Sequence, residues 1–325
     1  MSIYLGGGTP SLWRPDCIAA AIAAIRSTFD GSPAEVTIEA NPTDCTDDNL
    51  AAWRAAGIDR ISIGVQSFEP AELVTLGRDH RFGDGRAAVA RSLAAGFTTS
   101  ADFIFGTPGR GPAEAPPAGA LAPGVDLRAD HLSIYELTIE DRTAFGKRVR
   151  DGRLVPLPED TLADLYVAID ARLSGAGYEH YEISSYARPG KRAVHNSLYW
   201  RGAAFLGLGV GAASLELTAD GGGRRQTNPR RAVDYLTAPG APAERTDSSA
   251  SELAADRAWL GLRTSDGVAE QDLAAAPGLA EALVAAQLAD RKAGRICPTL
   301  RGFLMADQIA SRVVASWGAK VRPPG

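Results

Sequence analysis

The first 190 residues repeat one hydrophobic pattern: an alanine-rich amphipathic helix, a glycine, and then a β-rich run. Three copies are "LAAWRAAG" before "IDRISIGVQSF", "VARSLAAG" before "FTTSADFIFG", and "IDARLSGAG" before "YEHYEISSY". Gly57, Gly96 and Gly177 stand where a left-handed residue ends a helix. The first helix is predicted from apolar residues at helical spacing: Ile18, Ile22, Ile25 and Phe29.

Six β-rich runs are predicted as strands: Ile3–Leu5, Val36–Ala40, Ile61–Val65, Phe103–Phe105, the run around Ile134, and Ile183 with its neighbours. Strands that alternate with helices at this spacing are parallel and joined by crossovers. The carboxyl ends of such strands carry the ligand site. The pattern therefore predicts an α/β fold of barrel-like type.

Polar residues or glycines recur at the predicted strand ends. They are Gly6-Gly7-Gly8, Glu39, Asn41, Gln66, Asp102, Gly106, Glu136, Glu182 and Ser184-Ser185. For any single carboxylate, capping of the next helix is an equally good explanation. A glycine triplet more often forms a tight turn than a ligand loop. Together they indicate one polar rim on an enzyme-like scaffold, with the ligand left open.

Two segments break the rhythm. Residues 110–128 are rich in proline, which forbids a regular crossover helix, so an irregular loop is expected there. After about Arg188 an aromatic and glycine-rich segment, "HNSLYWRGAAFLGLGVGAAS", precedes a polar turn with four arginines, "ADGGGRRQTNPRRAVDYL". From about Ser248 the chain is predicted to be helical, with a short hairpin before the last helix, in a winged-helix-like layout.

The composition limits the classes of binding partner that are expected. The net charge is −5 and the pI is about 5.5, which argues against nucleic acid and gives no strong membrane signal. No apolar run reaches membrane-spanning length and no signal peptide is visible. Cys17, Cys45 and Cys297 stand far apart, without metal-ligand or disulfide spacing. A cytoplasmic protein with reduced thiols is expected, and its C-terminal part is expected to be a structural appendage.

An ordered set of motifs runs over nearly the whole chain: "YLGGGTPS", "IEANP", "RISIGVQSF", "LGRDH", "DFIFGTPGR", "HLSIYELTIEDRT", "YEHYEISSYARPG", "HNSLYW" and "FLGLGVGAAS". In this set the chain resembles radical S-adenosylmethionine (SAM) proteins of the oxygen-independent coproporphyrinogen III oxidase family, and most closely their HemW-like heme-chaperone branch. The resemblance implies a partial, open (β/α) barrel over 1–190, a connecting segment over 191–247 and a small helical domain over 248–325.

Members of that family begin with one more strand and a Cys-x3-Cys-x2-Cys loop that holds a 4Fe–4S cluster. This chain starts at the strand that corresponds to the family's second, and none of its cysteines has that spacing. The expectation is that Met1 is a misplaced start, with a truncation or a reduced protein as alternatives.

The resemblance also implies a set of SAM contacts: Gly7, Gly8, Thr9, Glu39, Gln66, Arg78 and Asp102. It points to His195 of "HNSLYW" as an axial ligand to heme iron. Tyr199 and Trp200 are candidates to stack on the macrocycle, and Arg201 or Arg225 to pair with propionates. The alternative for His195 is an ordinary hydrogen-bonded packing residue.

Three functions remain open from the sequence. The first is a protein that binds heme and delivers it to a heme-accepting protein. The second is the oxidase, which removes two propionate carboxyl groups of a porphyrinogen as CO2 through a 5′-deoxyadenosyl radical. The third is an inactive remnant of the fold. The segment "HNSLYWRGAAFLGLGVG" replaces the Arg-Asn-Phe-Gln-Gly segment of the oxidases, which favours the first.

Overall fold

The computed structural model describes residues 1–78, 83–108 and 127–317 of the 325-residue chain. The chain forms two compact units, Met1–His195 and Asn196–Gly325, which are described separately. The predicted proline-rich loop falls almost entirely on residues 109–126, outside the described residues.

The first unit is built on a seven-stranded sheet of order β1-β2-β3-β4-β5-β7-β6. Its strands are β1 Ile3–Leu5, β2 Val36–Ala40, β3 Arg60–Gln66, β4 Thr98–Phe105, β5 His131–Glu136, β6 Glu179–Glu182 and β7 Ser185–Ala187. Its α-helices are α1 Pro15–Thr28, α2 Asp47–Ala55, α3 Pro70–Thr75, α4 Asp84–Ala94, α6 Ala144–Arg150 and α7 Glu159–Gly175, with short 3-10 helices at Pro10–Leu12 and Pro42–Asp44. Strands β1 to β5 are parallel neighbours.

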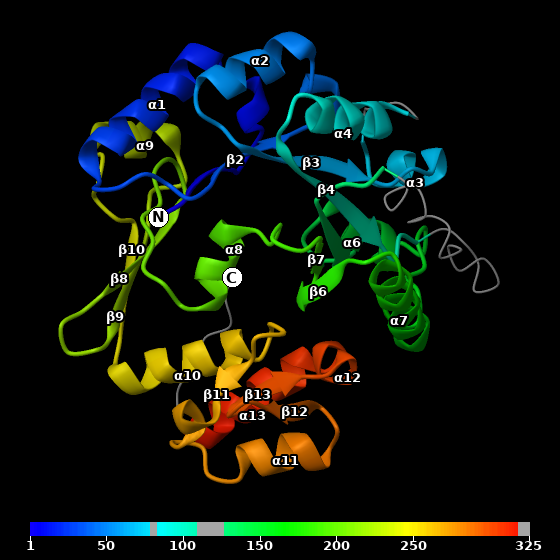
Figure 1. The fold of residues 1–325 in the computed structure, drawn as a ribbon, viewed down its shortest axis with the longest axis vertical. Coiled ribbons are helices and arrows are strands. Elements are labelled where there is room, and N and C mark those ends of the chain that lie inside the picture. The colour runs from blue at the N-terminus through cyan, green and yellow to red at the C-terminus, as the bar shows by residue number, and fades with distance from the viewer. Residues whose placement is uncertain (79–82, 109–126, 318–325) are drawn as a thin grey trace. The chain divides into compact units, whose positions relative to one another are not determined.

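Alternation along the strands separates an apolar face from a polar one. In β3, Ile61, Ile63 and Val65 are fully buried in a core that also holds Ile18 and Ile22 of α1. Helices α1, α2 and α4 lie over this face of the first four strands (Figure 1). The opposite, inner face carries the polar residues of the same strands: Thr37 and Glu39 of β2, Arg60, Ser62 and Gln66 of β3, Ser100 and Asp102 of β4, and His131 and Ser133 of β5. The predicted partial, open α/β barrel is thus confirmed, with a polar interior.

The sheet departs from the predicted parallel series at its end. Ile183, predicted in a strand, lies in a tight turn between β6 and β7. Glu182 closes this turn by accepting the backbone N–H of Ser184. Strand β7 therefore runs back between β6 and β5 and pairs antiparallel with both.

The helix-ending glycines are confirmed and one predicted core residue is not. Gly57, Gly96 and Gly177 have φ of +88°, +83° and +85°, the left-handed conformation that favours glycine. Phe29, predicted on the apolar face of the first helix, is 41% exposed, because α1 ends at Thr28 and the backbone becomes extended at Phe29.

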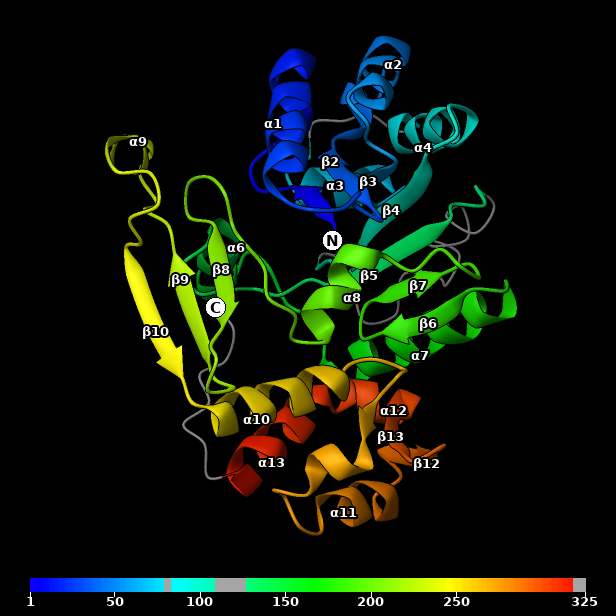
Figure 2. The same ribbon diagram turned by 60° about the vertical axis from the view of Figure 1, so that its left-hand side comes forward.

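The second unit has a sheet and a helical part. Strands β8 Ala213–Leu217, β9 Gly223–Thr227 and β10 Glu244–Ser248 form an antiparallel sheet of order β10-β9-β8, clear in Figure 2, with α9 Ala232–Thr237 between β9 and β10. Arg224 and Arg225 therefore lie in a strand and not in the predicted polar turn, since β9 pairs with both β8 and β10. Arg224 also forms ion pairs across the sheet with Asp247 and Glu216.

The helical part has the predicted winged-helix-like order. It consists of α10 Ala250–Gly261, β11 Val268–Ala269, a 3-10 helix Glu270–Leu273, α11 Leu279–Ala285, β12 Ala289–Lys292, β13 Arg295–Pro298, α12 Leu300–Leu304 and α13 Ala306–Trp317. Strands β12 and β13 form the hairpin, and β11 joins it in a three-stranded sheet. A second apolar core, which includes Leu283 and Val313, holds these elements together. Among the described helices, none combines the length and the apolar character needed to span a bilayer.

Candidate functional site

The glycine loop after β1 is open and needs glycine. Gly7 and Gly8 are exposed, with φ of +81° and +66°. A β-carbon built at either residue would meet no atom within 4 Å, so the backbone conformation, and not crowding, requires glycine here. Thr9 follows as the residue before the 3-10 helix Pro10–Leu12. The loop therefore exposes a backbone without side chains at Gly7 and Gly8.

Glu39 at the end of β2 is tied to this loop. Its Oε2 accepts the backbone N–H of Gly7 at 3.2 Å, and its Oε1 accepts the hydroxyl of Tyr4 at 2.7 Å. The carboxylate thus holds the loop and Tyr4 in place, and it is only half-buried.

Gln66 at the end of β3 has a strained backbone. Its φ is +65°, and the register with β4 shifts between Ile63 and Gln66. A non-glycine residue in this region typically costs about 1–3 kcal/mol, and such strain is concentrated at ligand clamps and active sites. The Gln66 side chain lies back along the strand, since a β-carbon at Gly64 would come within 2.7 Å of its Nε2.

Asp102 of β4 lies at the centre of a serine network on the inner face. It accepts hydrogen bonds from Ser62 at 2.7 Å and from Ser100 at 3.2 Å. Loss of solvent raises the pKa of Asp102 above its usual value, and the serine hydroxyls, Ser133 included, offset only part of this rise.

Arg78 is carried by the segment after α3 and not by a strand end. It is exposed and follows α3, where its backbone N–H donates to the Leu73 carbonyl. The structure therefore joins the glycine loop to Glu39 and places Gln66 and Asp102 on the same inner face, whereas Arg78 stays a prediction.

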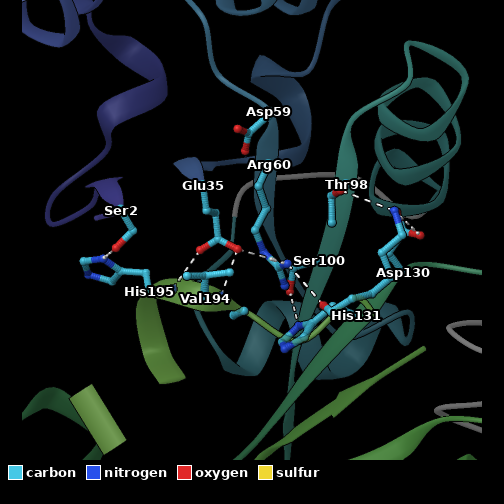
Figure 3. Close-up of polar contacts among 12 residues, drawn as sticks. Ser2, Glu35, Asp59, Arg60, Thr98, Ser100, Asp130, His131, Val194 and His195 are labelled. Carbon is cyan, nitrogen blue, oxygen red and sulfur yellow. Dashed lines mark hydrogen bonds and ion pairs between the residues drawn. The ribbon is translucent and has the colours of Figure 1, made fainter. Parts of the chain in front are cut away.

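His195 lies near the amino-terminal ends of the strands. Its Nδ1 is 2.9 Å from the hydroxyl of Ser2 (Figure 3). Its ring stacks on Tyr4, with the ring centroids 4.7 Å apart. Partial burial lowers the pKa of His195, and the nearby charge of Glu35 opposes this only in part. The imidazole is therefore mainly neutral near pH 7, which is the form that binds metals.

A buried ion pair fixes the segment that carries His195, at the start of α8 Val194–Trp200. Glu35 accepts the backbone N–H groups of Val194 at 3.0 Å and His195 at 2.9 Å, and it faces Arg60 at 3.5 Å (Figure 3). Glu35 is 5% exposed and Arg60 is 3% exposed. Sequence reasoning missed both residues, although a charge directly before a buried strand, or as its first residue, is an available signal.

A second chain of contacts crosses the inner face. Ser100 bonds to His131 Nδ1 at 2.8 Å, His131 Nε2 bonds to the hydroxyl of Tyr181 at 2.8 Å, and that hydroxyl accepts the Ala193 N–H at 3.3 Å. Complete burial lowers the pKa of His131 well below its usual value, so this ring stays neutral. The chain runs from the partner of Asp102 to the residues directly before His195.

The residues named for macrocycle and propionate contacts belong to the second unit. Tyr199 follows His195 by four residues, is 39% exposed and packs edge-on against Phe205. Arg225 is already paired with Asp256 at 2.8 Å, and Arg201 approaches Asp266 at 3.9 Å. Arg201 is therefore the less engaged of the two arginines.

The described residues do not fit a 4Fe–4S cluster. No group of three or more His, Cys, Asp or Glu side chains in them could hold a metal ion. Cys17 is exposed, whereas Cys45 is buried and its pKa is raised to about 12, which keeps the thiol protonated. Cys297 belongs to the other unit. The glycine loop and the Glu39 carboxylate do fit a small ligand that offers a carboxylate, an amine or hydroxyl groups.

Comparison with known proteins supports this assignment of the fold. Residues 2–117 match the model of the radical SAM superfamily. The structure is similar to "Coproporphyrinogen III oxidase (HemN) from Escherichia coli is a Radical SAM enzyme", with a TM-score of 0.76 over 96% of this chain and 77% of that one. Sequence identity is 23%, so this similarity shows the fold alone.

Several known proteins have a higher sequence identity to this chain than the HemN structure has. The chain is 36% identical over 312 residues to the "Heme chaperone HemW" of Mycobacterium tuberculosis, covering 95% of this chain and 79% of that protein. It is 37% identical to the "Heme chaperone HemW" of Escherichia coli over 72% of this chain and 61% of that one. The mitochondrial radical S-adenosyl methionine domain-containing protein 1 of Bos taurus is 36% identical over 83% of this chain and 63% of that protein. The predicted family is thus confirmed, and the chain belongs to the HemW family, a HemN-like branch of the radical SAM superfamily.

Proposed function

We propose that this protein binds heme and delivers it to an acceptor protein, with His195 as an axial ligand of the iron. Heme iron offers an axial position that an imidazole nitrogen fills. The observation that carries the proposal is the fixed, mainly neutral imidazole of His195, held by Ser2 and by the Glu35 clamp on its backbone. The relatives named heme chaperones support the same function.

The contact with Ser2 suits a metal ligand. A histidine that ligates a metal through one ring nitrogen usually donates from the other to an oxygen. When Ser2 accepts from Nδ1–H of His195, the lone pair is on Nε2, and that tautomer is ready to bind iron.

The proposal extends to SAM at the inner-face rim. Gly7, Gly8 and Thr9 supply backbone groups, and Glu39 supplies a carboxylate suited to an ammonium or to ribose hydroxyls. Gln66, Arg78 and Asp102 are assigned to the same site. Because the described residues do not fit the cluster, no radical step is assigned to them.

A titration with hemin tests heme binding. We expect His195→Ala to weaken hemin binding at least about tenfold and to change the absorption spectrum of the bound heme, since loss of even a ligand's hydrogen-bond partner typically costs that much affinity. His180→Ala is the matched control, because His180 is bonded to Asp170 away from this site. Equal titration curves for the parent and His195→Ala would remove His195 from the proposal.

Delivery and the oxidase alternative need separate assays. Apomyoglobin serves as a heme-accepting probe, and we expect transfer from the heme-loaded protein to be faster than from free hemin at the same concentration. An anaerobic assay with coproporphyrinogen should give no decarboxylated product. Product formation would favour the oxidase, and absence of both binding and product would favour an inactive remnant.

A further inference from the structure

Tyr4 touches both proposed sites through one side chain. Its hydroxyl donates to Oε1 of Glu39 at 2.7 Å, and the other carboxylate oxygen of Glu39 accepts the N–H of Gly7. Its ring stacks on His195, with an interplanar angle of 20°. Glycine loop, carboxylate, phenol and imidazole therefore form one continuous chain of direct contacts.

The side chain has little freedom to move alone. A β-carbon built at Gly6 would lie 2.5 Å from Cε1 of Tyr4 and 3.1 Å from Oε1 of Glu39, so the ring and the carboxylate pack tightly against the backbone of the loop. Burial and the charge of Glu39 raise the pKa of Tyr4, and its hydroxyl stays protonated and donates. Movement of Glu39 must consequently be followed by the Tyr4 hydroxyl or break its hydrogen bond.

We propose that Tyr4 is a positioning residue that couples SAM binding at the glycine loop to the orientation of His195. A ligand ammonium or hydroxyl that donates a hydrogen bond to Glu39 shifts the carboxylate. The Tyr4 ring transmits this shift to the stacked imidazole. Because such coupling is reciprocal, bound heme changes the affinity for SAM by the same factor. The inference rests on the proposed function and adds a link between its two ligands.

The other route between the sites is longer. It passes from Asp102 through Ser100, His131 and Tyr181 to the Ala193 N–H, and it reaches the backbone before His195 and not the imidazole. The Tyr4 route uses one side chain and ends on the imidazole ring itself. A substitution at Tyr4 therefore interrupts this route and leaves the longer route intact.

The experiment follows the His195 ring by NMR while SAM is added, without hemin. The chain has four histidines, and His195→Ala identifies the resonance. We expect SAM to shift the His195 signal in the parent, and Tyr4→Phe, which keeps the ring but removes the hydroxyl, to abolish that shift while calorimetry still detects SAM. Tyr178→Phe is the matched control, because Tyr178 is a buried tyrosine whose hydroxyl donates to the Ala129 carbonyl, on strand-end backbone that carries neither Glu39 nor His195.

A second readout measures the coupling directly. Saturating SAM should change the hemin dissociation constant about fivefold or more in the parent and in Tyr178→Phe, and less than about twofold in Tyr4→Phe. The inference is overturned if SAM binds without moving the His195 signal, if Tyr4→Phe retains the parent's shift, or if calorimetry detects no SAM binding. Failure of hemin binding alone overturns the proposed function, whereas the NMR result still decides the role of Tyr4.

Discussion

At the scale of single residues, the site depends on charges that the fold has buried. Glu35 and Arg60 are both almost fully buried, and Glu35 also accepts the first two N–H groups of α8. A buried ion pair contributes little net stability, but removal of one partner leaves the other charge uncompensated. The pair therefore fixes the position of His195 more than it stabilises the barrel.

Glu35→Ala should lower the free energy of unfolding of the first unit by about 3–5 kcal/mol, because it leaves the charge of the buried Arg60 guanidinium without its ion-pair partner Glu35. Urea denaturation followed by circular dichroism measures this. Glu179→Ala removes an exposed partner of Arg192 and should cost at most about 1 kcal/mol. Equal effects of the two substitutions would show that the buried pair has no special role.

Asp102 should make stability depend on pH in a defined direction. Its folded pKa is raised by burial, so its contribution to stability is fully present below the usual carboxyl pKa of about 4 and is lost as the pH rises through the folded pKa. Asp102→Asn cannot ionise, and its stability relative to the parent should therefore increase from pH 4 towards pH 7.

Denaturation curves at several pH values measure this difference for Asp102→Asn. Asp16→Asn is the control, since Asp16 is exposed and its hydrogen bond from Arg14 lowers its pKa, which gives the opposite sign. A difference between Asp102→Asn and the parent that does not change with pH would contradict the burial argument.

The sequence predicts a backbone conformation where it demands a residue type. Gly7 and Gly8 follow a predicted strand, and their positive φ values agree with a need for glycine, whereas their role as SAM contacts comes from the family resemblance. The Tyr4–His195 stack and the Glu35 clamp were not predicted, since they join residues 191 and 160 positions apart. The local pattern of hydrophobic and polar residues does not predict contacts between residues so far apart in the sequence.

At the scale of elements, periodicity predicted the helices and parallel strands well and failed at a reversal. The run "YEHYEISSY" has strand composition throughout, yet a turn at Ile183 divides it into β6 and β7. The buried Glu182 that supports this turn was interpreted as one residue of a polar rim at the strand ends. Here a side-chain hydrogen bond to the backbone outweighs β-propensity.

Helix α10 offers a direct test of local capping. Ser249 and Glu252 form a reciprocal capping box at its start, so Ser249→Ala should lower the stability of the second unit by about 1 kcal/mol. Ser251→Ala, at an exposed position in the first turn, should have almost no effect. Thermal unfolding measures both, and indistinguishable melting curves would argue against the cap.

At the scale of the whole molecule, the chain consists of two compact units. Each has an apolar core of its own, one beneath the seven-stranded sheet and one among α10, α11 and α13. The change in pattern after about Arg188 predicts a division of the chain into a barrel, a connecting segment and a helical domain. The sheet of β8, β9 and β10 was not predicted, because β9 (GRRQT) and β10 (ERTDS) lack the apolar alternation that identifies a strand.

Leu283→Ala should destabilise the second unit by about 2–5 kcal/mol, because Leu283 is fully buried in the second core. Hydrogen exchange should increase in α10, α11 and α13 and remain unchanged in β2 to β4. Leu304→Ala, at a side chain that is 37% exposed, is the control. Equal loss of protection in both units would contradict the assignment of separate cores.

The central claim is that His195 ligates heme iron, and imidazole rescue of His195→Gly tests it most directly. The account predicts that His195→Gly loses the parent's bound-heme absorption spectrum, that free imidazole restores it by filling the vacated position, and that imidazole leaves the parent unchanged. A parent-like spectrum and hemin affinity in His195→Gly without imidazole would contradict the claim.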